Sequence, residues 1–344
     1  AVAEGELAEL RAKLGAAPLS ADNYFQSYGH VGIHEEMLKD RVRTETYRKA
    51  ILQNPHLFKD KIVLDVGCGT AILSMFAAKA GAKHVYGVDC SGILTQAQQI
   101  INANNLSDTI TLINGKVEEV TLPTPTVDII ISEWMGYFLL YESMLDTVIF
   151  ARDKWLAPNG FIFPDKAVLY ICAIEDQEYK KEKIDFWDDV YGFDMSVFKK
   201  IAINEPVVDC IDPRSICSTS SAILTLDLLT CTTDDVNFTS DFKLKVTRDD
   251  FIHGLCGYFE CAFTQIHKPI GWSTAPFAKY THWKQTMLYL DDKVLIAHRD
   301  EELLGTVSTK QNKKNNRDLD IKLTLNFKGK DCELNNHQQD YRLR

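Results

Sequence analysis

Between residues 60 and 165, short runs rich in valine and isoleucine alternate with helical stretches, and this alternation constrains the fold more than any other feature of the chain. Runs such as KIVLDV (61–66) and VDIIIS (127–132) are apolar almost throughout, which is typical of strands covered on both faces. The pattern therefore predicts a doubly wound α/β domain around a parallel sheet. Strands are expected at 61–66, 84–89, 109–115, 127–132 and 160–164, and helices at 71–82, 92–104 and 142–156.

After Pro164 the pattern changes to apolar residues at about every second position. Such alternation between turn-like stretches is typical of antiparallel strands in a barrel or sandwich. The stretches that show it are 222–231, 241–248, 257–263, 284–290 and 320–327. We therefore expect an N-terminal helical or flexible segment (1–22), the α/β domain (23–164) and an antiparallel β-barrel-like domain (165–344).

Composition excludes several classes of protein. The length of 344 residues fits two domains, and 45% hydrophobic residues are typical of a soluble globular protein. No apolar run reaches the roughly 18 residues of a membrane-spanning helix. The first residues lack the apolar segment of a signal peptide, and because the chain starts at Ala1 rather than Met, we expect sequence upstream.

Charge and cysteines point to a compartment and a kind of partner. The net charge of −10 disfavours nucleic-acid binding and favours a cationic partner, although the acidity could also serve only solubility. Nine scattered cysteines without a C-x-x-C pair are expected to be reduced thiols. Reduced thiols predict a cytoplasmic or nuclear location.

The stretch LDVGCGT (64–70) lies where the first strand turns into the first helix. Gly67 and Gly69 would let the backbone approach a ligand at the carboxyl end of the strand, although a G-x-G can also be a simple tight turn. A dinucleotide site fits poorly, because the third fingerprint position is Ile72. Asp65 at the entrance of the loop would also repel a pyrophosphate, by roughly 4 kcal/mol per charge pair at about 4 Å.

A ligand with cationic groups and no phosphate would suit this loop better. S-adenosylmethionine has an ammonium, a sulfonium and an adenosine. Asp89, at the end of the second strand and 22 residues after Gly67, could accept hydrogen bonds from ribose hydroxyls. The domain is therefore interpreted as a Rossmann-like methyltransferase domain that binds S-adenosylmethionine.

Two glutamates follow the fourth strand in SEWMGYFLLYESML (132–145). Glu133 and Glu142 have apolar neighbours, and glutamate is rarely buried unless it is paired. They could form a glycosidase pair, a metal site or a clamp on a cation. A planar guanidinium suits the clamp best, since it donates to carboxylates in pairs. Glu142 alone could instead stabilise the start of its helix.

At these motifs the chain resembles the type I protein arginine methyltransferases, from about Asn23 to Arg344. The resemblance is carried by YFQSY (24–28), VLDVGCGT (63–70), SEWMGYFLLYESML (132–145), KNNRDLD (314–320) and YTHWKQ (280–285). It implies transfer of methyl groups from S-adenosylmethionine to protein arginines, giving mono- and asymmetric dimethylarginine and S-adenosylhomocysteine. No metal is implied.

The resemblance also implies a role for each matching residue. Glu133 and Glu142 would grip the guanidinium, His282 would pair with Asp40, and Arg43 would bind the carboxylate of the cofactor. The remaining cofactor contacts would be His34, Asp65, Gly67 and Gly69, with Asp89 on the ribose and Glu118 on the adenine amino group. Tyr24 and Tyr28 would belong to a lid, and Met37 and Met144 would shape the methylation pocket.

One position departs from the family pattern: Ala71 stands where glycine is usual. A methyl group there restricts positive φ and could lower cofactor affinity. A catalytically weak paralogue that acts as a scaffold or activating subunit is therefore the alternative prediction.

The resemblance further implies a homodimer or higher oligomer, formed by an arm at about 180–196 that includes Phe186–Met195. The other reading of this arm is an excursion over the chain's own barrel. The expected substrates are glycine- and arginine-rich segments and histone tails, and no contact with membranes or nucleic acid is expected.

Overall fold

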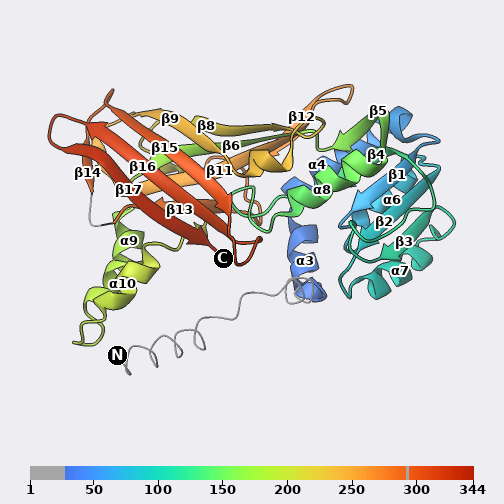
Figure 1. The fold of residues 1–344 in the computed structure, drawn as a ribbon, viewed down its shortest axis with the longest axis horizontal. Coiled ribbons are helices and arrows are strands. Elements are labelled where there is room, and N and C mark those ends of the chain that lie inside the picture. Colours follow the sequence, from blue (N-terminus) through green and yellow to red (C-terminus); the bar gives the residue numbers. More distant parts are fainter. Residues whose placement is uncertain (1–27, 292–293) are drawn as a thin grey trace.

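The computed structural model describes residues 28–291 and 294–344 of the chain. The predicted N-terminal segment 1–22 and the predicted lid residue Tyr24 lie outside these residues. The molecule is elongated, with the α/β part at one end and the antiparallel part at the other (Figure 1). Among the described residues, no helix is long and apolar enough to span a membrane.

The α/β part contains one five-stranded sheet in the order β3-β2-β1-β4-β5, and all of its pairs are parallel. Its strands are β1 (Ile62–Val66), β2 (His84–Asp89), β3 (Ile110–Asn114), β4 (Val127–Ser132) and β5 (Leu156–Phe163). The helices that connect or follow them are α6 (Ile72–Lys79), α7 (Leu94–Ala103) and α8 (Met144–Trp155). The predicted doubly wound fold is confirmed, and β1 and β4 are buried over almost their whole length.

Three helices precede the sheet: α3 (Val31–Lys39), α4 (Arg41–Leu52) and α5 (Pro55–Phe58). Helix α4 lies between the two parts of the molecule (Figure 1). Its Tyr47 donates a hydrogen bond to the carbonyl of Ser132 at 2.8 Å, and the Tyr47 ring packs against Phe263 and Trp272 of the antiparallel part. The same tyrosine therefore joins the end of β4 to the second domain.

The antiparallel part starts with β6 at Lys166, three residues after β5 ends. One sheet has the order β7-β13-β11-β6-β8 with β12 beside β11, a second has the order β17-β16-β15-β9, and β10 pairs with β14. The strands are β6 (Lys166–Ile174), β7 (Val207–Asp209), β8 (Ser221–Asp227), β9 (Thr239–Lys245), β10 (Asp250–Ile252), β11 (Gly254–Phe263), β12 (Ile270–Ser273), β13 (Gln285–Tyr289), β14 (Leu295–Ala297), β15 (Glu302–Gln311), β16 (Leu319–Lys328) and β17 (Glu333–Leu343). The barrel-like second domain is confirmed.

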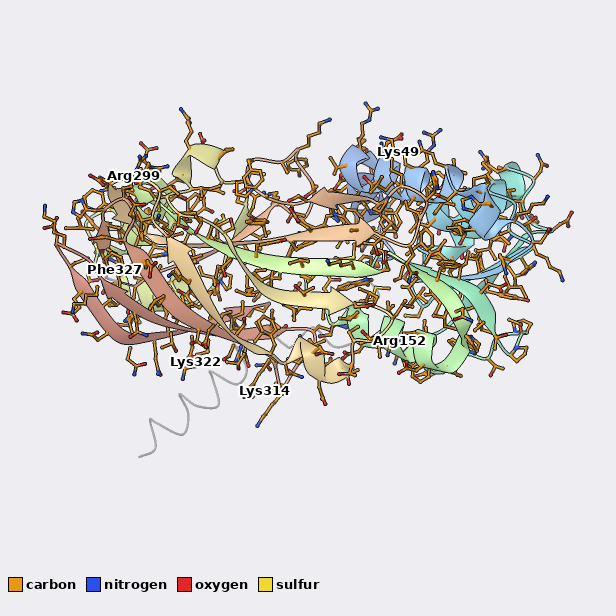
Figure 2. All side chains as sticks on the ribbon, turned by 90° about the horizontal axis from the view of Figure 1, so that it is seen from above. Lys49, Arg152, Arg299, Lys314, Lys322 and Phe327 are labelled. Carbon is orange, nitrogen blue, oxygen red and sulfur yellow. The ribbon has the colours of Figure 1, made fainter. Side chains whose placement is uncertain are left out.

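The two parts also meet along helix α8. Arg152 of this helix donates to the carbonyls of Leu228 and Cys231 at 3.0 and 2.7 Å, and its side chain lies at the junction of helix and barrel (Figure 2). Two helices of the α/β part, α4 and α8, thus contact the antiparallel part.

A helical arm extends from the barrel on the side of β13 and β17 (Figure 1). It consists of α9 (Gln177–Lys183), η1 (Asp185–Asp188) and α10 (Ser196–Ala202). Lys199 holds it together through 2.8 Å ion pairs with Asp185 and Asp188. Its exposed apolar side chains are Phe186, Tyr191, Phe193, Val197, Phe198 and Ile201. The arm projects away from the barrel, so the reading of it as an excursion over the barrel is wrong.

Candidate active site

The site lies at the carboxyl ends of β1 and β4. Strand β1 continues through α6 to β2 on one side, whereas β4 lies on its other side. In parallel sheets such a switch point opens a crevice for ligands. Here it forms part of a cavity of about 540 Å³, within the usual range of roughly 300–1,000 Å³ for small-molecule sites. The predicted residues that line it are Tyr28, His34, Met37, Arg43, Gly67, Gly69, Asp89, Glu118, Glu133, Glu142, Met144 and His282.

The glycine loop requires its glycines. Gly67 and Gly69 have φ of 71° and 51°, in the left-handed region that favours glycine. A Cβ on Gly67 would lie 2.3 Å from Cε of Met144, and one on Gly69 would lie 3.2 Å from the His34 ring. Asp89 fixes the loop, because its carboxylate accepts from the amides of Gly69 at 2.9 Å and Ser91 at 2.8 Å.

Asp65 does not line the cavity. Successive side chains of a strand point to opposite faces, and Asp65 lies fully buried with Oδ2 accepting from the Ser74 hydroxyl of α6 at 2.6 Å. Burial raises the pKa of Asp65 to about 6, against the opposing effect of the Ser74 hydrogen bonds. Asp65 therefore lies beneath the loop and not in the cavity, which corrects the prediction that it contacts the cofactor. For the same reason it does not directly repel a phosphate in the cavity.

Ala71 follows the loop with φ of 64° and is fully buried. It adopts the left-handed conformation for which a glycine would be the usual choice. The residue is absent from the cavity lining among the described residues. Its methyl group therefore does not narrow the cavity, and the scaffold alternative, which depended on this residue, gains no support from it.

Glu133 has a cationic partner within the protein. Nε and Nη2 of Arg43 each donate to Oε2 of Glu133 at 3.0 Å, and the two side chains are only 7% and 9% exposed. The guanidinium of Arg43 thus gives this buried carboxylate a partner of opposite charge. Neither bond uses Oε1 of Glu133, so this oxygen can accept from a ligand.

Glu142 reaches the same cavity from a strained turn. Its φ is 75°, and Ser143 after it has a φ of 58°. Oε2 accepts from the hydroxyl of Tyr28 at 2.9 Å. The two glutamates therefore line one cavity, as the sequence predicted, but only Glu133 is paired with Arg43.

His282 and Asp40 form the predicted pair. Nδ1 and the backbone amide of His282 lie 2.8 and 2.9 Å from Oδ2 of Asp40. Asp40 also accepts from the amide of Arg43 at 3.0 Å, as the N-cap of α4. Burial opposes ionisation of Asp40, but these hydrogen bonds outweigh it and keep its pKa below the usual value. Asp40 itself stands behind His282 and outside the cavity lining.

The other predicted residues complete the walls. Nε2 of His34 lies 2.7 Å from the carbonyl of Tyr28. Glu118 accepts from the Thr147 hydroxyl at 2.6 Å. Trp283, next to His282, donates from Nε1 to the carbonyl of Met135 at 2.7 Å, which ties the histidine to the loop between the two glutamates.

The cavity also includes residues to which the sequence assigned no role. Arg317 comes from the barrel and bonds to Glu142, 175 positions earlier. Tyr137 and Tyr141 stack with centroids 6.1 Å apart, and Cys90 follows Asp89. Arg317 belongs to the KNNRDLD stretch that carries part of the family resemblance, but the sequence indicated no role for the arginine itself.

This donor set fits S-adenosylmethionine. The guanidinium of Arg43 suits a carboxylate, the glycine loop leaves space that a Cβ would fill, and Asp89 suits ribose hydroxyls. In the part of the chain that the structure describes, no group of three or more His, Cys, Asp or Glu side chains could hold a metal.

Comparisons with known proteins agree with both domains. Residues 63–160 match the methyltransferase domain family, and residues 165–330 match the arginine methyltransferase oligomerization subdomain.

Two curated relatives are similar over almost the whole chain. Protein arginine N-methyltransferase 1 of Chlamydomonas reinhardtii is 59% identical over 325 residues, which is 94% of each chain. The protein of the same name from Dictyostelium discoideum is 59% identical over 310 residues, 90% of this chain and 91% of its own. Among solved structures, the Trypanosoma brucei PRMT1 enzyme–prozyme heterotetrameric complex with AdoHcy matches with a TM-score of 0.90 and 47% identity, covering 93% of this chain and 100% of that chain.

Proposed function

Because the chain belongs to the protein arginine N-methyltransferases, we propose that Glu133 and Glu142 hold the substrate guanidinium between them while its nitrogen is methylated. The protein is a type I enzyme that uses S-adenosylmethionine. The observation that carries the proposal is that both carboxylates line one cavity. One of them, Glu133, already has its charge balanced by Arg43.

When bound, S-adenosylmethionine supplies an electrophilic methyl group on a sulfonium, and S-adenosylhomocysteine is the product. Arg43 would hold its carboxylate, Gly67 and Gly69 would accommodate the methionine part, and Asp89 would bind the ribose. Glu118 would accept from the adenine amino group, and His34 would lie beside the cofactor. Met37 and Met144 limit the space around the nitrogen that is methylated.

The glutamates orient and polarise the guanidinium. A protonated guanidinium has a pKa above about 12 and is a poor nucleophile. Charge-assisted hydrogen bonds to Oε1 of Glu133 and to Glu142 hold positive charge on the nitrogens that they contact. The third nitrogen is left with more electron density and a fixed direction. Holding reacting atoms at near-attack distance can supply about 7–11 kcal/mol of the barrier.

A proton must leave during or after transfer. His282 is positioned by Asp40, whose ionised carboxylate holds Nδ1 and the backbone amide. Nε2 then remains for the proton, which is the usual arrangement of a histidine base. A glutamate of the clamp is the other acceptor.

The decisive experiment is Glu142→Gln. The amide keeps the size of the side chain and can still accept from Tyr28, but it has lost the charge. We expect methylation of an arginine peptide to fall at least 1,000-fold, while the Kd for S-adenosylmethionine changes by less than about three-fold. The loss corresponds to about 4 kcal/mol of transition-state stabilisation. Glu45→Gln, on the outer face of α4 and paired with Arg48, is the matched control. Wild-type turnover of the Glu142 variant would refute the clamp.

We also propose the class of substrates and the assembly. The net charge of −10 favours cationic segments such as glycine- and arginine-rich sequences and histone tails. The oligomerization subdomain and the exposed aromatics of the arm, including Phe186 and Phe193, support a homodimer in which each arm contacts the α/β domain of its partner. Sedimentation equilibrium tests this, since only monomer at micromolar concentration would contradict it.

A cytoplasmic and nuclear location is proposed as well. All nine cysteines are free thiols, and free thiols are typical of reducing compartments. Imaging of the tagged protein in cells tests the proposal, and an exclusively secreted protein would contradict it.

A further inference from the structure

We propose that Arg317, which the barrel contributes, is a positioning residue that holds Glu142 in its working conformation. The inference rests on the role proposed above for Glu142. The two residues are joined by two hydrogen bonds at the backbone of Glu142: its amide donates to the carbonyl of Arg317 at 2.9 Å, and its carbonyl accepts from Nη1 of the Arg317 side chain at 2.7 Å.

The turn needs such support because its backbone is unfavourable. Phe138, Leu139, Glu142 and Ser143 all have positive φ, between 50° and 75°. None of them is glycine, and side chains with a Cβ are disfavoured in this region. Residues in such conformations persist when the surrounding structure determines them. Arg317 contacts Glu142, which has the largest φ of these four residues.

Further hydrogen bonds hold the segment that carries Arg317. The Ser143 hydroxyl donates to the carbonyl of Asn316. The side-chain amide of Gln311 donates to the carboxylate of Asp146 in α8 at 2.7 Å. Inside the barrel loop, the Asn312 amide donates to the carbonyl of Asp318 at 3.0 Å. The amide nitrogen of the Asn315 side chain donates to the Asp318 carboxylate at 2.7 Å. Arg317 therefore extends from a loop whose shape is fixed by its own hydrogen bonds.

The two glutamates are therefore held by different parts of the molecule. The carboxylate of Glu133 is held by Arg43 from helix α4, whereas the backbone of Glu142 is held by Arg317 from the barrel. Loss of Arg317 should misplace the second carboxylate and leave the first in position. Substrate turnover should then fall, while cofactor binding, which depends on Arg43, the glycine loop and Asp89, should be retained.

The test compares Arg317→Ala and Arg317→Lys with the matched control Lys314→Ala. Lys314 lies on the same loop and its side chain points into solvent (Figure 2). We expect Arg317→Ala to lower kcat/KM for an arginine peptide at least 30-fold, with the Kd for S-adenosylmethionine within about three-fold of wild type. Arg317→Lys retains one donor for the Glu142 carbonyl and should recover part of the loss, to within about ten-fold. Lys314→Ala should stay within two-fold.

A double-mutant cycle separates positioning from a general structural role. Peptide Kd is measured with S-adenosylhomocysteine present for Glu142→Gln, Arg317→Ala and the double variant. If Arg317 acts through Glu142, the double variant binds peptide no more weakly than Glu142→Gln alone. Additive losses would overturn the inference, as would an equal loss of cofactor affinity or a wild-type kcat/KM in Arg317→Ala.

The two proposals fail in different ways. An active Glu142→Gln variant refutes the clamp and this inference with it, whereas an inactive Glu142→Gln beside a fully active Arg317→Ala refutes only the inference. If Arg317→Ala does not fold, as melting curves would show, the result for Arg317→Lys decides: a wild-type kcat/KM overturns the inference, and a loss of three- to ten-fold supports it.

Discussion

Two loops form the site, and they reach the same unusual backbone conformation by opposite means. The loop after β1 uses Gly67 and Gly69 at its left-handed positions. The loop after β4 places Phe138, Leu139 and Glu142 there, although a left-handed residue with a Cβ costs roughly 1–2 kcal/mol. The difference follows from what each loop carries: the first leaves space for a ligand, whereas the second buries Phe138 and Leu139 in the core and presents Glu142 to the cavity.

The comparison teaches where each conformation is encoded. The glycine loop is largely local: its residues can adopt the required angles alone, with one carboxylate, Asp89, to fix it. The glutamate loop depends on distant residues, since Arg317 and Trp283 hold it from the barrel. Local sequence therefore predicts the first loop, and only the folded molecule explains the second.

Among the variants that compare the two loops, the largest effect is expected from Gly136→Ala, which tests the glutamate loop. A Cβ at this position would lie 2.0 Å from the carbonyl oxygen of Tyr141, a backbone atom. The chain must move next to Glu142, and we expect kcat/KM for peptide to fall at least 100-fold, or about 2.7 kcal/mol. Steady-state kinetics measures this. A change of less than three-fold would show that the loop tolerates displacement and that its geometry is not critical.

Gly67→Ala tests the glycine loop and should have a smaller effect. Its Cβ would meet Met144 Cε at 2.3 Å, but this is the end of a flexible side chain that can rotate away. The positive φ remains unfavourable, so we expect the Kd for S-adenosylmethionine to rise roughly 10- to 30-fold, about 1.4–2 kcal/mol. Isothermal titration calorimetry gives the value. An unchanged Kd would contradict the assigned role of the loop in cofactor binding.

Asp65→Asn tests the support beneath the glycine loop. The folded protein raises the pKa of Asp65 from 3.8 to about 6, so the native state binds this proton more tightly than the unfolded chain. Stability from this group is present below pH 4 and is lost as the pH rises through about 6. We expect the variant to be more stable than wild type at pH 8 by about 1–2 kcal/mol, since it removes a buried charge.

The pH dependence is the sharper part of this prediction. Between pH 8 and pH 5 the wild type should recover roughly 1.4 kcal/mol relative to the variant. Urea unfolding of both proteins at the two pH values measures the difference. A stability difference that is the same at pH 5 and pH 8 would contradict the raised pKa.

The smallest effect is expected from Ala71→Gly. Glycine removes the left-handed strain but loses a buried methyl group and gains freedom in the unfolded chain, so the free energy of unfolding should rise by only about 0.5 kcal/mol. Ala77→Gly is the control, because Ala77 is equally buried but lies inside α6. There the same substitution should cost about 1 kcal/mol or more. Equal losses at both positions would show that Ala71 carries no strain.

The sequence predicted the parallel sheet to within a few residues, because buried strands such as β1 and β4 are apolar almost throughout. It did not predict β17, whose sequence ELNNHQQDYRL is mostly polar, or β15, which contains Gly305. Strand β17 forms a hairpin with the adjacent β16, and β15 pairs with β9, which lies far earlier in the chain. In both cases the pairing partner, and not the propensity of the segment itself, makes it a strand.

The same reasoning applies to the site. Residues next to strand ends, such as Asp89 and Glu133, were found because a parallel sheet gathers them at one edge. Asp65 was misplaced because one residue of shift along a strand reverses the face. Arg317 had no role in advance, since nothing in its own segment indicates which turn it contacts.

Asp40 shows how tightly three parts of this molecule are joined. One carboxylate begins α4 and positions His282, and the same residue ends α3. Few other side chains can make both contacts at this position. Glutamate would place its carboxylate one methylene further along, asparagine could cap the helix but would bring no charge to His282, and alanine has no acceptor for either contact. A saturation mutagenesis screen for activity should therefore find aspartate alone tolerated at this position, in a protein whose outer helix faces accept many changes.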